Sequence, residues 1–205
     1  MSDYVEIAKL GVATMHEAAG RTGVVDLDLT QVVPGSRVAG PARIAVCRTG
    51  DNSMVHAAVA HAKPGEVLVL TSVEPVPVAL VGELLVTQAK VRGVAGILVD
   101  GAVRDFDELV EIGLPVWTRW VRASGATKGE VGELDASVVV GGAAIRPGDL
   151  VVMDCDGAMA LASDRVAEVL PLARERVEHE RAMRLRYAAG ELSYDLNGLR
   201  EIVEG

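Results

Sequence analysis

The sequence predicts a single α/β domain that carries a long C-terminal helix and a tail. Helical and strand-like hydrophobic periods alternate along the first 119 or so residues, a pattern typical of α/β proteins. Half of the 205 residues are apolar, so the chain can bury a substantial core. No repeat, low-complexity tract or clear linker interrupts it. We therefore expect one domain over residues 1–188 and a tail over residues 189–205.

The expected elements follow one another in a regular order. Apolar residues at helical spacing predict a first helix over residues 4–19, and Gly20 is a suitable end for it. Further along, short aliphatic runs predict buried strands, and the segments between these runs have helical spacing. The expected strands cover residues 42–48, 66–72, 95–100 and 115–119, and the expected helices cover residues 53–62, 81–92 and 106–112.

The chain changes character after these elements. Between residues 138 and 161, short β-branched segments are separated by Gly, Pro and Asp, which predicts tight antiparallel hairpins. The last long helix is expected over residues 163–188, where many Glu and Arg residues indicate a largely solvated surface.

Composition excludes several classes of function. A formal net charge of -9 repels phosphate backbones, which argues against nucleic-acid binding. Cys47 and Cys155 form no C-x-x-C pair, so neither a zinc site nor a disulfide framework is indicated. No apolar run has the length of a membrane span, and "MSDYVEIAKL" has acidic residues where a signal peptide needs a basic region. We expect a cytoplasmic protein with reduced thiols and no membrane partner.

Two neighbouring segments contain candidate ligand-binding residues. Arg104 and Asp105 follow an apolar strand, and the carboxyl ends of strands in α/β sheets are where ligands bind. On the residues alone, a surface turn in which Asp105 caps the next helix explains the pair somewhat better. Gly82 is expected at a helix start, where free amides and the helix dipole attract an anion. Glu83 also fits as a favourable acid in the first turn of that helix.

Other polar clusters have structural explanations of the same weight. Asn52 and His56 lie one helical turn apart, and an Asx cap before a helix explains them as well as a site does. Glu17 fits a solvated helix end. Asp154 and Asp156 resemble metal ligands in their spacing, but an Asp-Gly hairpin turn explains them more simply. The sequence contains no G-x-S-x-G, P-loop or H-E-x-x-H motif.

Taken together, these segments resemble a known family in their order and spacing. The chain is similar to the RraA-like family, and more narrowly to its 4-hydroxy-4-methyl-2-oxoglutarate/4-carboxy-4-hydroxy-2-oxoadipate aldolase branch. The segments that carry the resemblance are "LGVATMHEAAGR", "GDNSMVHAAV", "PGEVLVL", "VGELL", "RGVAGILVDGAVRDFDEL", "GLPVWTR" and "PGDLVVMDCDGAMAL". The tail segment "LSYDLNGLRE" also looks like that branch.

The resemblance implies a swivelling β/β/α domain, assembly as a homotrimer or homohexamer, and a class II pyruvate aldolase that requires Mg²⁺ or Mn²⁺. The family pattern is an acidic residue, twenty intervening positions and then Arg-Asp, which Glu83, Arg104 and Asp105 match. By that resemblance Asp105 binds the metal and Arg104 contacts the keto acid, while Glu83 and Glu17 are candidates for orienting the group that moves the proton.

The resemblance also implies the substrate contacts. Backbone amides from Gly82 to Leu85 would hold the pyruvyl carboxylate, and Glu17, Asn52 and His56 would line the pocket, some of them from a neighbouring subunit. The substrate-binding set is therefore Gly82, Glu83, Leu84, Leu85, Arg104, Asn52 and His56. Aldolases of this branch usually have Asp where this chain has Glu83, and one methylene moves a carboxylate by about 1.5 Å. We expect this difference to affect substrate and rate more than fold or metal binding.

Two functions from different classes follow. The first is a lyase that cleaves a 4-hydroxy-2-oxo acid to pyruvate and an oxo acid, with oxaloacetate decarboxylation as a side activity through the same pyruvate enolate. The second is a non-catalytic regulator that resembles the ribonuclease E regulators of this family and binds a basic protein segment through its acidic surface.

Overall fold

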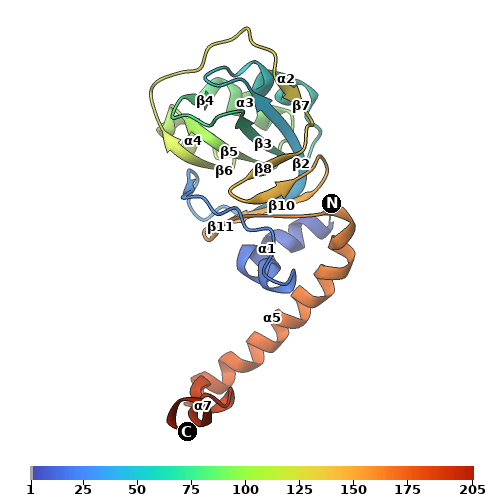
Figure 1. Cartoon of the computed structure of the whole chain (residues 1–205), viewed down its shortest axis with the longest axis vertical. Helices are drawn as coiled ribbons and strands as arrows, with labels where there is room; N and C mark the ends of the chain where they lie inside the picture. The colour runs from blue at the N-terminus through green and yellow to red at the C-terminus, as the bar shows by residue number, and fades with distance from the viewer. Residues whose placement is uncertain (1) are drawn as a thin grey trace.

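The computed structural model describes residues 2–205, and its body is a mixed α/β structure built on one large, nearly closed sheet (Figure 1). The strands are β1 (Thr30–Gln31), β2 (Val38–Cys47), β3 (Val67–Ser72), β4 (Ala79–Val81), β5 (Gly96–Val103), β6 (Val116–Val121), β7 (Glu133–Leu134), β8 (Val138–Val140), β9 (Ala143–Ile145), β10 (Leu150–Asp154) and β11 (Gly157–Leu161). The helices are α1 (Ser2–Ala18), α2 (Ser53–His61), α3 (Glu83–Val91), α4 (Phe106–Ile112), α5 (Val166–Ala188), α6 (Ser193–Leu196) and α7 (Leu199–Glu204), with a 3-10 turn at Ser163–Arg165.

The large sheet combines a parallel centre with antiparallel edges. Its order is β1-β6-β5-β3-β2-β10-β11, with β4 paired to β5 and β7 paired to β2. Strands β2, β3, β5 and β6 are parallel neighbours, and α2, α3 and α4 lie in the connections between them. The hairpin β10–β11 joins the edge of β2 in antiparallel orientation. The predicted α/β class and the predicted hairpins are confirmed.

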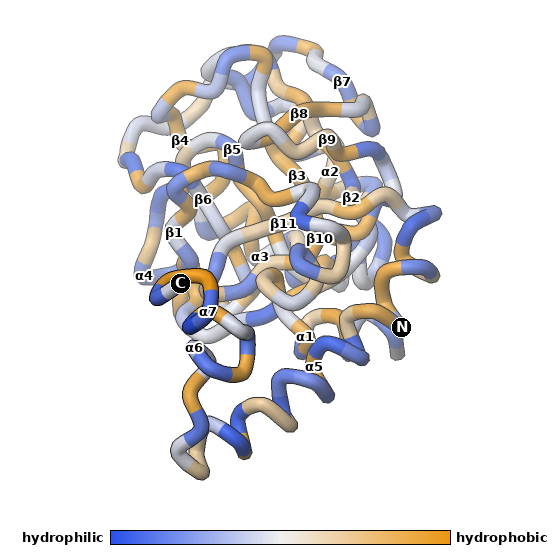
Figure 2. The backbone as a smooth tube through the Cα atoms, turned by 60° about the horizontal axis from the view of Figure 1, so that its bottom comes forward, coloured by the Kyte–Doolittle hydropathy of each residue, from blue (hydrophilic) through white to orange (hydrophobic). Residues whose placement is uncertain are grey.

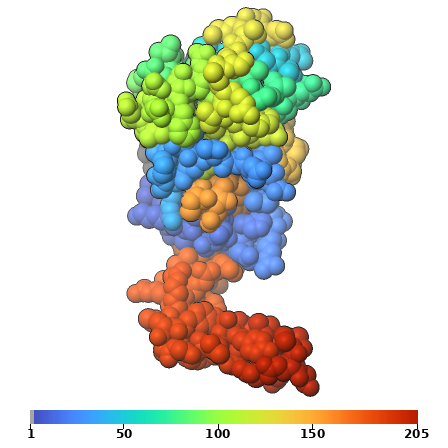
Figure 3. All heavy atoms as spheres, turned by 90° about the vertical axis from the view of Figure 1, so that its left-hand side faces the viewer, coloured from blue at the N-terminus to red at the C-terminus, as the bar shows by residue number. Residues whose placement is uncertain are grey.

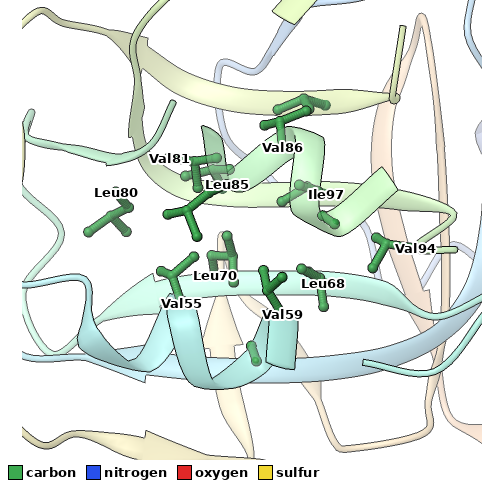
Figure 4. Packing of buried hydrophobic residues seen from close by; sticks show 14 of the residues in the cluster. Val55, Val59, Leu68, Leu70, Leu80, Val81, Leu85, Val86, Val94 and Ile97 are labelled. Carbon is green, nitrogen blue, oxygen red and sulfur yellow. The ribbon is translucent and has the colours of Figure 1, made fainter. Parts of the chain in front are cut away.

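The parallel strands are buried on both faces, which explains their nearly continuous aliphatic sequences. Leu68 and Leu70 of β3 pack against α2 and α3, and Figure 4 shows them beside Val55 and Val59. Val67 and Val69, which alternate with these leucines, belong to a second core on the other face of the sheet. This second core also contains residues of β10 and β11, so it fills the interior of the curved sheet.

A third apolar cluster attaches the terminal helices to the body. Leu150 and Val152 of β10 alternate with the second-core residues and face α1 and α5. Helix α1 is bent at Gly11, which has φ 82, so the expected continuous helical face is interrupted. Near the start of the helix, Val5 is 59% exposed, whereas Ile7 is buried. The expected helix is present, with this bend inside it.

The end of the chain extends away from the body as an arm. In α5 the buried residues are Val169, Leu170 and Ala173, all in its first half. The remainder of α5, with α6 and α7, forms a separate lobe in Figure 3, and hydrophilic residues recur along it in Figure 2. The solvated character predicted for this helix is confirmed over its second half. Among residues 2–205, no helix combines the length and apolarity needed to cross a membrane.

The short strands β1, β4 and β7 were not predicted. Each has two or three residues, too few to show a period-two pattern. Of these, β4 matters most for function, because it ends directly before Gly82 and brings that residue beside the end of β5.

Candidate functional site

A pocket of about 420 Å³ opens where β4 and β5 end and where α2, α3 and α4 begin. Its position agrees with the expectation that ligands bind at the carboxyl ends of parallel strands. The polar and charged side chains that line it are Asn52, His56, Glu83, Arg104, Asp105, Glu108 and Lys128. Most of the residues implied by the resemblance therefore lie together in one concave site.

Asp105 has an unusual backbone conformation at the start of α4. Its φ of 58 and ψ of 47 place a non-glycine residue in the left-handed region, where strain is commonly found at functional sites. Asp105 occupies the N-cap position of α4, but its side chain makes no capping hydrogen bond to that helix, so capping does not explain the carboxylate. Instead, Oδ2 accepts a hydrogen bond from the Glu83 amide at 3.1 Å and lies 3.5 Å from Arg104 Nε.

Two glycines make room for the Arg-Asp pair. A Cβ atom on Gly82 would lie 2.5 Å from Asp105 Oδ2 and 3.0 Å from Arg104 Cγ. A Cβ atom on Gly125 would lie 2.5 Å from the Arg104 Nη1. The Arg104 amide in turn donates to Val81 O at 3.0 Å, which ties the end of β5 to the end of β4. The pair is therefore enclosed by backbone on two sides.

The amides from Gly82 to Leu85 are not all available to a ligand. The Glu83 amide binds Asp105, and the Leu85 amide donates to Gly82 O at 3.2 Å within the first turn of α3. The amides of Gly82 and Leu84 have no backbone or side-chain acceptor among residues 2–205. A ligand carboxylate at this helix start would thus meet two donors, not four.

Asn52 and His56 contribute unpartnered polar atoms to the pocket. Asn52 Nδ2 donates to Leu80 O at 2.9 Å, but Asn52 Oδ1 and His56 Nε2 are buried and have no partner within the described chain. The Asx turn before α2 is made by Asp51, whose Oδ1 accepts the Ser53 amide at 2.7 Å. The cap explanation therefore applies to Asp51 and leaves Asn52 Oδ1 without a partner. Buried polar atoms without partners need a ligand or water to satisfy them.

The electrostatics of the pocket keep His56 neutral. Burial, and after it the charge of Lys128, lower the pKa of His56, while Asp51 opposes this shift weakly. A backbone hydrogen bond from Ser53 is the main cause of the lowered pKa of Asp51, which remains ionised. The neutral ring of His56 can accept or donate one hydrogen bond to a ligand through the unpartnered Nε2, according to its tautomer.

Two residues that line the pocket, Glu108 and Lys128, were not predicted from the sequence. Glu108 lies one turn beyond Asp105 on α4, and spacing alone could have indicated it. Lys128 belongs to the loop after β6, which reaches the pocket through long-range hydrogen bonds such as that between the Asn52 amide and Thr127 O at 3.0 Å. No local sequence signal marks such a loop.

Glu17 lies elsewhere in the chain. Its Oε2 atom is 3.2 Å from Arg21 Nε and 3.7 Å from Arg176 Nη1, on the side of the body formed by α1 and α5. Figure 1 shows α1 on the opposite side of the body from α3. A role for Glu17 in catalysis therefore requires a second copy of the chain.

The carboxylates of the pocket suit a hard divalent cation. Asp105 Oδ1 accepts no hydrogen bond from residues 2–205, and neither Glu83 nor Glu108 forms an ion pair within them. Carboxylate oxygens with room for water are the ligands that Mg²⁺ and Mn²⁺ prefer. Asp105 can hold such an ion directly, with Glu83 beside it.

A second acidic group is explained by the fold. Ligand atoms of Asp154, Cys155 and Asp156 lie within 4.8 Å of one another. However, Asp154 Oδ1 accepts the Asp156 amide and Oδ2 accepts the Val12 amide, each at 2.9 Å. The predicted hairpin turn is confirmed, because Asp154 pairs with Gly157 across β10 and β11.

The two cysteines play no part in the pocket. Both are free, with Cys155 exposed and Cys47 buried. Burial raises the pKa of Cys47 to about 11, so its thiol is not ionised near neutral pH.

Comparisons with known proteins agree with this geometry. The RraA-like family, described as Aldolase/RraA, matches residues 3–160. A Halalkalibacterium halodurans protein provisionally named 4-hydroxy-4-methyl-2-oxoglutarate aldolase is 33% identical over 146 residues, which are 71% of this chain and 70% of that protein.

Solved structures show the same fold. A Streptomyces coelicolor protein described as an unusual member of the RNase ES inhibitor RraA protein family is 28% identical, with a TM-score of 0.74 over 88% of this chain and 92% of that chain. An uncharacterised Pseudomonas syringae pv. tomato protein aligns with a TM-score of 0.79 at 23% identity, over 88% of this chain and 85% of that chain.

Proposed function

The chain belongs to the RraA-like family, and from that premise we propose that it is a divalent-metal-dependent lyase that cleaves a 4-hydroxy-2-oxo acid to pyruvate and a second oxo acid. The observation that carries the proposal is the Arg104–Asp105 pair, which is held between Gly82 and Gly125 and faces a pocket with unpartnered polar atoms. The name of the aldolase-like relative supports a substrate of the 4-hydroxy-4-methyl-2-oxoglutarate or 4-carboxy-4-hydroxy-2-oxoadipate type.

The chemistry requires stabilisation of negative charge. Cleavage of the bond between C3 and C4 leaves an electron pair on the fragment that becomes the enolate of pyruvate. A Mg²⁺ or Mn²⁺ ion held by Asp105 would supply Lewis acidity at the keto oxygen. Arg104, whose side chain lines the pocket beside Asp105, donates hydrogen bonds to the same developing oxyanion.

The remaining groups orient the substrate and move its proton. The amides of Gly82 and Leu84 bind the carboxylate next to the keto group. Glu83 accepts the proton of the 4-hydroxyl group and then protonates the enolate carbon, either directly or through a water. Asn52 Oδ1 and His56 Nε2 bind polar groups on the leaving half of the substrate.

The same enolate is formed when oxaloacetate loses carbon dioxide, so we expect oxaloacetate decarboxylation as a side activity. We further propose that the chain acts in the cytoplasm as a homotrimer or homohexamer, in which a neighbouring copy brings Glu17 toward the pocket. Within one chain, Glu17 lies beside α1 and α5, away from the pocket. This position supports an assembly in which a neighbouring copy supplies Glu17.

The direct test is pyruvate release measured with lactate dehydrogenase. The purified protein is assayed with 4-hydroxy-4-methyl-2-oxoglutarate, 4-carboxy-4-hydroxy-2-oxoadipate and oxaloacetate, with Mg²⁺ or Mn²⁺ and after treatment with EDTA. Metal-dependent pyruvate from a hydroxy-oxo acid is the expected result. Pyruvate from oxaloacetate alone would limit the function to decarboxylation, and no pyruvate from any substrate would refute the lyase.

A protein-binding regulator is the second candidate. The structural relative described as a member of the RNase ES inhibitor family and the net charge of -9 favour it. A regulator of this kind would bind a basic segment of a ribonuclease E-type enzyme, and binding would weaken with salt. If the wild type and the Asp105→Asn variant both bind such a segment and neither releases pyruvate, the regulator is supported over the lyase.

A further inference from the structure

Asp51 is a buried acid beside the pocket to which the proposed chemistry gives no role. It is 1% exposed, and it does not belong to the pocket lining, which includes the next residue, Asn52. The Ser53 amide is the main cause of the lowered pKa of Asp51, so the carboxylate is ionised and neither oxygen carries a proton. A buried carboxylate needs hydrogen-bond donors, and the donors around Asp51 identify what it holds in place.

The two oxygens of Asp51 hold two different segments of the chain. Oδ1 accepts the Ser53 amide at 2.7 Å, within the turn that begins α2. Oδ2 accepts the Glu130 amide at 3.3 Å and lies 3.4 Å from Thr127 Oγ1, in the loop between β6 and β7. An ionised carboxylate has two acceptor oxygens, whereas the amide of an asparagine has one. Asp51 therefore joins this loop to the start of α2 in a way that an asparagine could not.

The loop between β6 and β7 lies between the start of α2 and β4 as a short strand would. On one side, Thr127 forms backbone hydrogen bonds of 2.8 and 3.0 Å with residues 50 and 52. On the other side, Ala79 forms backbone hydrogen bonds of 2.7 and 3.1 Å with residues 124 and 126. Apart from residue 126, residues 121–130 are exposed, so hydrogen bonds rather than packing fix this segment.

The same loop limits where the guanidinium group of Arg104 can lie. A Cβ atom on Gly125 would lie 2.5 Å from Arg104 Nη1, so the loop backbone is directly against that nitrogen. Arg104 Nε lies 3.5 Å from Asp105 Oδ2. If the loop moved away, the guanidinium group would gain freedom, whereas Asp105 would keep its hydrogen bond from the Glu83 amide.

We propose that Asp51 is a positioning residue, which fixes the loop between β6 and β7 against the start of α2 and thereby holds the guanidinium group of Arg104 in place in the pocket. Asp51 touches no reacting atom and acts through Gly125 and Arg104. The effect on turnover rests on the proposed lyase function, whereas the effect on the position of Arg104 does not.

The first test uses a matched pair of substitutions. Asp149 is 6% exposed and also holds two segments, through the amides of Arg146 and Ser163, outside the pocket. Asp51→Asn and Asp149→Asn therefore remove one acceptor oxygen each from equivalent arrangements. Both should lower the melting temperature, but only Asp51→Asn should lower kcat, by about tenfold, with Mn²⁺ affinity unchanged. Pyruvate release is measured well below both melting temperatures.

A purely structural role of Asp51 predicts a different result. It would give equal losses of kcat in the two variants, or a normal kcat in Asp51→Asn. Either outcome would overturn the inference and leave the lyase function intact.

A double variant tests the route through Gly125. Asp51→Asn and Gly125→Ala should each lower kcat about tenfold, and both act on the position of Arg104. The combined variant should therefore lose little more than tenfold, because the two changes remove the same alignment. A loss of about a hundredfold would mean that the two residues act independently, which would overturn this route.

The second test does not depend on turnover. The Nε–H signal of Arg104, assigned by its disappearance in Arg104→Lys, is followed by ¹H–¹⁵N NMR. It should shift or broaden in Asp51→Asn and match the wild type in Asp149→Asn. This result together with no pyruvate release from any substrate would refute the lyase and keep Asp51 as the residue that positions Arg104. An unchanged signal in Asp51→Asn would overturn the inference, whatever the turnover.

Discussion

The two ends of the body treat their buried polar groups in opposite ways. Beside α1 and α5, both carboxylate oxygens of Asp154 accept backbone amides, and Asp149 likewise binds the amides of Arg146 and Ser163. At the pocket end, Asn52 Oδ1 and His56 Nε2 are buried without partners. Hydrogen-bonding capacity is used for folding at the first end and is kept for a ligand at the second.

This difference predicts which substitutions affect activity and which affect stability. Changes at the pocket end should reduce turnover and leave the folded state intact. Changes beside α1 should lower the free energy of unfolding and leave turnover at low temperature intact. The predictions below run from the largest expected effect to the smallest.

Asp105→Asn should have the largest effect on activity. The amide keeps the size of the side chain and an acceptor for the Glu83 amide, but it removes the charge that holds a divalent cation. Metal-dependent pyruvate release should fall by about a thousandfold. Mn²⁺ binding, followed by electron paramagnetic resonance, should weaken while the melting temperature stays within about two degrees. Undiminished turnover would show that the metal is held elsewhere.

Asp154→Ala should have the largest effect on stability. The buried Val12 amide loses its acceptor at the bend of α1, and the Asp156 amide loses its acceptor in the hairpin turn. The free energy of unfolding, measured with urea, should fall by about 2 kcal/mol. Turnover at 20 °C or so should be unchanged. If activity were lost at normal stability, the Asp154–Asp156 group would be part of the active site and the contrast between the two ends would fail.

Gly125→Ala should affect turnover moderately. The added methyl group would lie 2.5 Å from Arg104 Nη1, and the flexible guanidinium group would move to relieve the contact. We expect kcat to decrease about tenfold, because Arg104 would no longer be aligned with the developing oxyanion. The melting temperature and Mn²⁺ binding should match the wild type. A variant with normal kcat would show that the position of Arg104 is not critical.

The titration of His56 should give the smallest effect. In the unfolded chain His56 takes up a proton near pH 6.5 or so, whereas burial and Lys128 lower its pKa in the folded protein. Between the two pKa values the unfolded state binds more protons, so stability should decrease as the pH falls through about 6.5 and level off below the folded pKa.

His56→Gln isolates this contribution. The difference in unfolding free energy between wild type and variant should be constant above about pH 7.5 and should shift against the wild type as the pH falls below about 6.5. The pKa of His56, followed by NMR, should rise in Lys128→Met, because one of its two lowering causes is removed. A histidine that titrates at or above its ordinary value would contradict the buried environment described for it.

Much of the fold could be predicted because its signals are local. The aliphatic runs of β3 and β5, the helices between them and the hairpin of β10 and β11 follow from periodicity and turn residues. The bend at Gly11 could not be predicted, since the amide of the next residue, Val12, donates to Asp154, which lies 142 residues further along the chain.

For the candidate site, the sequence by itself determined the residue types and the ends of the strands that carry them. Arg104, Asp105 and Gly82 could be placed there because each follows a strand or begins a helix. Tertiary structure decided the rest: the left-handed backbone of Asp105, the unpartnered atoms of Asn52 and His56, and the arrival of Lys128 from a distant loop. The physical reason is that periodicity records which face of an element is buried, whereas hydrogen-bond satisfaction and charge pairing depend on groups that only the folded chain brings together.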